Sequence, residues 1–132
     1  MRLFLFALLS LPLASCAVPR KITVVDAPYP ERPTIRSVRA EGDTLRVTVK
    51  QDTPGAWIAG VKAETIQGDV YLHTVHISSA VHATEFPVDL SGKKFPDDWR
   101  KRLYWMVGDS ISSPVNPLIV PAREIRRSKI EL

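Results

Sequence analysis

Apolar and polar residues alternate along much of the chain, and this pattern indicates β-strands. The clearest case is residues 44–50, where Leu45, Val47 and Val49 fall on one face and polar residues on the other. Turn-forming residues, such as those around Gly42, separate the alternating segments. We predict strands over residues 34–40, 44–50, 57–66, 70–77, 85–90, 102–107 and 115–120, with one helical turn within 96–101.

Seven short strands at this spacing predict a β-sandwich. The apolar positions Ile35, Val38, Leu45, Val47, Trp57, Phe86 and Tyr104, with Gly42 and the run Ser113-Pro114-Val115-Asn116-Pro117, resemble a fibronectin type III or related Ig-like domain over residues 33–121. We therefore expect an all-β chain with a single seven-stranded antiparallel Ig-like β-sandwich over residues 34–121. Residues 122–132 are too few and too charged to fold alone, which predicts a charged tail.

The first 15 residues have the pattern of a signal peptide, with one positive charge, an apolar run and small residues before Cys16. Leu13-Ala14-Ser15-Cys16 resembles the lipobox of bacterial lipoproteins, in which the cysteine is lipidated and becomes the first mature residue. Cys16 is the only cysteine, and lipidation would explain an unpaired thiol in an exported protein. The alternative is an ordinary secretory peptide that is cleaved after Ala or Ser, with Cys16 incidental.

Residues 16–33 are expected to join the lipid anchor to the domain. Their prolines favour an extended tether, although residues 22–25 are β-prone and could add a strand to a sheet edge instead. Ala17 stands where an inner-membrane retention signal would place Asp. By resemblance, this predicts a protein on the outer membrane that faces the periplasm.

The chain has 18 basic and 14 acidic residues, a mild excess that is spread along the sequence. An exported protein without basic runs interleaved with aromatics is a poor partner for nucleic acid. The densest basic segments are residues 100–102 and 123–129, which are either a solvated face or a surface attracted to anionic lipid headgroups.

Two motifs suggest chemistry that their surroundings do not support. Gly108-Asp109-Ser110-Ile111 resembles the nucleophile block of the GDSL hydrolases, but no histidine follows Ser110 to act as its base. His73 and His76 are three positions apart on an expected strand, so they point to opposite faces and cannot ligate one metal ion from a regular strand. We therefore expect no enzyme activity, no metal and no other cofactor.

One strand is apolar on both faces. If Leu103 and Trp105 enter the core, Tyr104 and Met106 emerge on the far side, beside an outward-facing Ile58 on a neighbouring strand. These three residues are the candidate surface for a protein partner, because an exposed apolar patch usually marks an interface. The alternative is internal cover of this face, by residues 22–25 or by the tail.

These features predict a lipid-anchored cell-envelope protein that acts as a protein-binding or accessory module. The main alternative is a cell-wall or other glycan-binding lipoprotein that uses Trp99, Tyr104 or Tyr71 as a stacking platform. A hydrolase is a remote alternative.

Overall fold

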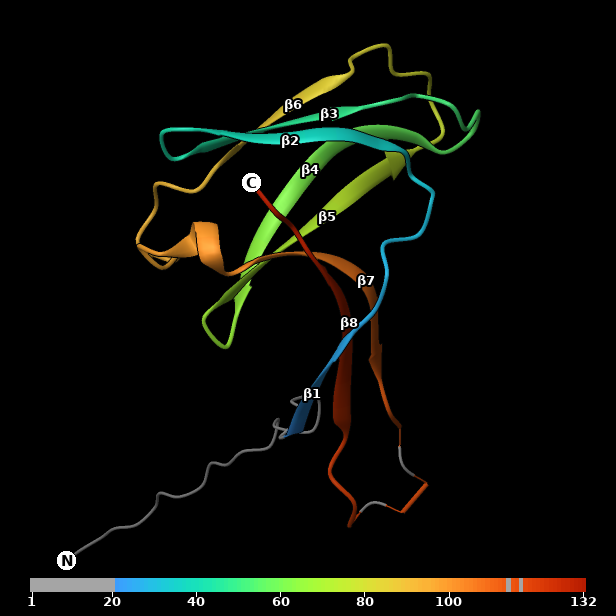
Figure 1. Cartoon of the computed structure of the whole chain (residues 1–132). Helices are drawn as coiled ribbons and strands as arrows, with labels where there is room; N and C mark the ends of the chain where they lie inside the picture. The colour runs from blue at the N-terminus through green and yellow to red at the C-terminus, as the bar shows by residue number, and fades with distance from the viewer. Residues whose placement is uncertain (1–20, 114, 117) are drawn as a thin grey trace, which may run out of the picture.

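The chain folds into two β-sheets that pack against each other (Figure 1). The structure is a computed structural model, and it describes residues 21–113, 115–116 and 118–132. The larger sheet has the strand order β1-β8-β7-β5-β4, and the smaller sheet has the order β2-β3-β6. The all-β class predicted from the alternation is confirmed.

The strands of the larger sheet are β1 (Lys21–Asp26), β4 (Trp57–Ile66), β5 (Asp69–Ile77), β7 (Leu103–Ile111) and β8 (Ala122–Lys129). The smaller sheet contains β2 (Ile35–Glu41), β3 (Thr44–Val49) and β6 (Glu85–Asp89). A 3-10 turn at Trp99–Lys101 precedes β7, within the range predicted for a helical turn.

Alternate residues of the strands fill the space between the two sheets. Leu45, Val47 and Val49 on β3 are each at most 1% exposed, as the sequence pattern predicts. The larger sheet, the β6–β7 connection and the residue after β8 meet them with Ile58, Val70, Leu72, Phe95, Trp99, Leu103, Trp105 and Ile130. We use the term outer face for the side of the larger sheet that is directed away from this core.

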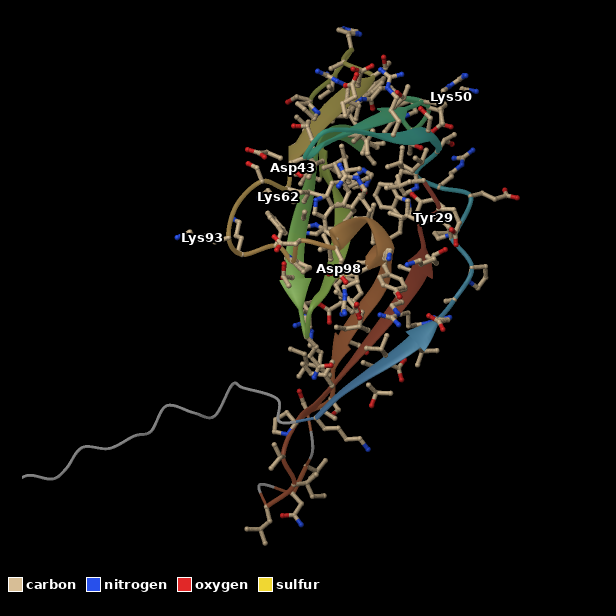
Figure 2. The ribbon with its side chains drawn as sticks, turned by 60° about the vertical axis from the view of Figure 1, so that its left-hand side comes forward. Tyr29, Asp43, Lys50, Lys62, Lys93 and Asp98 are labelled. Atoms are coloured by element: carbon tan, nitrogen blue, oxygen red, sulfur yellow. The ribbon has the colours of Figure 1, made fainter. Side chains whose placement is uncertain are left out.

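Residues 27–33 carry the chain from β1 in the larger sheet to β2 in the smaller one. Tyr29 belongs to this connection (Figure 2). Its ring lies 5.5 Å from the Trp105 ring, and its hydroxyl donates a hydrogen bond to the Pro33 carbonyl at 2.9 Å. Burial raises the pKa of Tyr29 to about 12. This part of the expected tether is therefore packed against the core.

The described residues form eight strands, so the prediction of seven is wrong. The additional strand is β1, which includes the β-prone residues 22–25. Residues 115–120 were predicted to be a strand, but among them the described residues form a loop. The last strand is β8, inside the expected tail of residues 122–132. Proline cannot donate a ladder hydrogen bond, and the ladder resumes only after Pro121.

The sheets are also not wholly antiparallel. β1 runs parallel to β8, with Lys21 opposite Ala122 and Asp26 opposite Arg127. β5 runs parallel to β7 over Val70 to Leu72. Parallel neighbours need a long connection, and here the chain passes through β6 in the other sheet before it returns as β7.

The larger sheet extends beyond the smaller one as an arm, which we define as β1 with the adjoining halves of β7 and β8 (Figure 1). A register shift between Met106 and Gly108 marks the point where β7 enters the arm. The arm ends in the β7–β8 loop, residues 112–121. None of the helical segments in the described part of the chain is long and apolar enough to cross a membrane.

Candidate functional site

The predicted orientation of β7 is confirmed. Leu103 and Trp105 are 0% and 7% exposed and belong to the core, whereas Tyr104 and Met106 are half-buried on the outer face. The strand therefore presents an aromatic side chain to the side of the sheet that the smaller sheet does not cover.

The predicted outward orientation of Ile58 is wrong. Its side chain is 2% exposed and lies in the core. The pairing of β4 with β5 shifts between Ile58 and Gly60, which leaves Ala59 as an extra, exposed residue. A bulge of this kind reverses the alternation, so that Ile58 and Val61 face the core from one strand although they are three positions apart. Ile58 is therefore not available to a partner.

Tyr104 is surrounded on the outer face by side chains from both neighbouring strands. The Tyr71 ring on β5 stacks against it, with centroids 5.8 Å apart and 27° between the ring planes. From β8, the Arg127 guanidinium carbon lies 3.8 Å and the Lys129 amine 4.8 Å from the centre of the Tyr104 ring. The expected apolar patch is thus covered by cations of the segment that was predicted to be a tail.

Arg127 joins strands across the whole width of this region. It donates hydrogen bonds to Asp69 at 2.8 Å and to the Tyr71 hydroxyl at 3.1 Å on one side, and to Asp26 at 3.2 Å on the other. Burial opposes its charge, but the bonds to Tyr71 and Asp69 leave the pKa of Arg127 above its usual range. Burial also raises the pKa of Tyr71, whose hydroxyl therefore remains a neutral partner at physiological pH.

An open hollow of about 520 Å³ adjoins the cluster of Tyr104 and Arg127. It is lined by Asp26, Ala27, Pro28, Tyr104, Arg127 and Lys129. The side chain of Arg127 is only 17% exposed and is held by two carboxylates, so it is fixed before any ligand arrives. A fixed arginine beside an aromatic ring can recognise a carboxylate or another aromatic side chain of a partner.

Sequence reasoning missed Arg127 and Lys129 because it placed them in a tail. The sequence signal for β8 is weak for a physical reason. Ile125 in β8 and Ile130 directly after it are an odd number of positions apart. Ile130 packs in the core, whereas Ile125 lies on the same face as Arg127. Their positions therefore show no period of two.

The residues considered for glycan stacking are mostly inaccessible. Trp99 is 2% and Tyr71 1% exposed, so neither can offer a ring face to a sugar. Tyr104 remains, but Tyr71 and the two cations of β8 already contact its ring. This arrangement favours recognition by the polar edge of the cluster over stacking of a sugar ring.

The motifs that suggested catalysis or metal binding lie apart from this cluster. Ser110 is exposed on the arm, opposite Glu124 on β8. His76 shares hydrogen bonds with the Thr74 hydroxyl and the Ala56 carbonyl. Within the described residues, no three His, Cys, Asp or Glu side chains come together in a group that could hold a metal ion. Cys16 lies outside the described residues.

The loop at the end of the arm is a second surface that the sequence prediction missed. Val115 is 101% and Leu118 87% exposed, and Ile119 and Val120 are exposed as well. Residues 115–120 were predicted to be a strand, but the prolines at positions 114, 117 and 121 disfavour a ladder there.

Neither a family model nor a curated protein or solved structure matches the chain.

Proposed function

We propose that this chain is a lipid-anchored cell-envelope protein that binds another envelope protein through the outer face around Tyr104. The observation that carries the binding role is the preorganised cluster of Tyr104, Arg127 and Lys129 beside an open hollow. Aromatic and arginine side chains dominate binding energy at protein interfaces, and rigid side chains lose little entropy when a partner docks.

The anchor in this proposal is Cys16. Its support is the sequence Leu13-Ala14-Ser15-Cys16 after an apolar run, with Ala17 favouring the outer membrane. The fold in this proposal is Ig-like. Its support is the packing of a three-stranded sheet against a larger one. The larger sheet departs from the usual order in two respects, because β5 rather than β4 lies next to β7 and β1 is added beside β8.

The anchor is tested by replacing Cys16 with Ser in cells that are fed a radioactive fatty acid. We expect the wild-type chain to be labelled and to sediment with membranes, and the Cys16→Ser variant to lose the label. A wild-type chain that takes up no label would refute lipid attachment, and the same extraction behaviour in both chains would refute its role in retention.

The binding role is tested with a photo-crosslinking amino acid at Lys129, which lines the hollow. The matched control carries the same amino acid at Lys93, which projects from the loop between β6 and β7 (Figure 2). We expect a discrete product in intact cells from position 129 only, and we expect it to disappear when Tyr104 is also replaced by Ala. The same products from both positions, or none from position 129, would contradict the proposed surface.

A further inference from the structure

Most of the large apolar side chains that the described part of the chain exposes lie at the end of the arm. They are Ile111, Val115, Leu118, Ile119 and Val120. The sequence from Ser110 to Ala122 contains no charged residue. An apolar group of this density that no other part of the described chain covers is unfavourable in water and is typical of an interaction site.

The path of the chain shows which surface this loop faces. β1 starts at Lys21, directly opposite Ala122 at the base of the loop, and runs parallel to β8 away from it. Only residues 17–20 separate Lys21 from Cys16. Whatever its conformation, a chain from Cys16 to Lys21 reaches at most about 18 Å. A lipid on Cys16 would thus hold the base of the loop close to a bilayer.

The charges around the loop agree with a bilayer as the occupant. Lys21 and Arg126 are exposed on the arm, Arg123 pairs with Asp109 at 2.6 Å, and Glu124 is exposed as well, so the charge behind the loop is positive on balance. An apolar tip with lysine and arginine behind it matches the acyl boundary and the phosphate layer of a membrane in that order.

We propose that the β7–β8 loop inserts Val115, Leu118, Ile119 and Val120 into the bilayer that carries the Cys16 lipid, as a second contact beside the anchor. This inference rests on the lipid anchor proposed above. A lipid on Cys16 holds the chain at one point only, and a second contact would also fix its orientation on the membrane. The loop would therefore set the direction in which the hollow beside Tyr104 faces.

The test uses the full chain, purified from cells and reconstituted in vesicles of phosphatidylethanolamine and phosphatidylglycerol. Val115→Cys supplies a thiol for an environment-sensitive NBD dye. Ser79→Cys is the matched control, because its loop between β5 and β6 lies at the opposite end of the molecule (Figure 1). Free thiols are counted first in the chain without an introduced cysteine. A free thiol there means that Cys16 carries no lipid, so the anchor proposal fails independently of the loop.

With Cys16 lipidated, we expect dye at position 115 to be several-fold brighter than dye at position 79, blue-shifted, and quenched by nitroxide-labelled lipids. Leu118→Asp with Ile119→Asp should return the signal at position 115 to that of the control, because both side chains are exposed and their loss leaves the core intact. Equal signals at positions 115 and 79 would overturn the insertion. A bright signal that nitroxide lipids do not quench would also overturn it and would point to packing against a second copy.

Discussion

Truncation of Trp105 tests the orientation of β7, on which the candidate site depends. The indole is 7% exposed, lies on the core side of the strand and contacts the Tyr29 ring. Trp105→Ala removes this side chain without changing the backbone of a strand that lies between two others. The adjacent residue, Tyr104, points to the other side and supplies a matched comparison.

The expected magnitude follows from the buried area. A tryptophan that buries about 200 Å² contributes about 5 kcal/mol at about 25 cal/mol per Å², as an upper estimate. Measured costs for Trp→Ala in cores are about 3–5 kcal/mol. Domains of this size have about 5–15 kcal/mol of stability in total, so the variant should lose a third or more of it.

Tyr104→Ala should cost less, about 1–2 kcal/mol. Its ring is half-buried, and what it loses is the stacking with Tyr71 and the contact with the Arg127 cation. Arg127 keeps its bonds to Asp69 and Asp26, so no buried charge is left without a partner. The stability lost by Trp105→Ala should therefore exceed that lost by Tyr104→Ala by more than the difference in side-chain size alone would suggest.

Urea unfolding followed by circular dichroism measures the stability of both variants. The circular dichroism signal comes from the backbone and does not depend on the tryptophan that is removed. We expect unchanged m-values and a midpoint that falls far more for Trp105→Ala than for Tyr104→Ala. If Trp105→Ala unfolds like the wild type while Tyr104→Ala is strongly destabilised, the strand faces the other way and the proposed binding surface is wrong.

Three further predictions test β8, the arm and the assignment of Ser110. Ile125→Ala and Ile130→Ala should each cost about 2–5 kcal/mol of stability in urea unfolding, whereas residues of a disordered tail would cost nothing. Ser110→Ala should leave both the melting temperature and hydrolysis of p-nitrophenyl esters unchanged, and selective loss of hydrolysis would show that Ser110 is catalytic. The hydrogen bond from Arg123 lowers the pKa of Asp109, so this pair adds stability above about pH 4 that is lost as the pH falls through the folded pKa. Asp109→Asn should accordingly flatten the fall of the urea midpoint below about pH 4, and equal slopes in both chains would contradict this.

The strands that could be predicted are those in which one face is wholly buried. In β3, each apolar residue contacts the core and each intervening residue does not, so the alternation in sequence is the alternation in space. The same rule gave the orientation of Trp105 and Tyr104. It failed at Ile58, because a bulge inserts one residue into the ladder and nothing in the local composition marks it.

β8 was missed for a different reason. Its charged side chains are not solvated along their whole length, because Arg127 lies over the ring of Tyr104 and bonds to Asp69 on β5. By its composition alone, β8 looks too polar to fold. The carboxylates that pair with its cations, and the ring that they contact, lie on strands far away in the sequence. The candidate site needs these long-range partners, so only Tyr104 and Met106 could be identified without the structure.

The pairing of β1 with β8 limits how the proposed lipid anchor could hold the domain. A flexible tether through residue 33 would let the domain sample many distances from the bilayer, but β1 attaches the chain to the sheet from Lys21 onward. From Ala122 to Lys129, β8 spans about 23 Å at about 3.3 Å per residue. If Cys16 carries a lipid, the hollow beside Lys129 stands a short, nearly fixed distance from the membrane. A partner that binds in this hollow must present its contact surface at the same distance from the membrane. This favours a protein of the same membrane over one that diffuses freely.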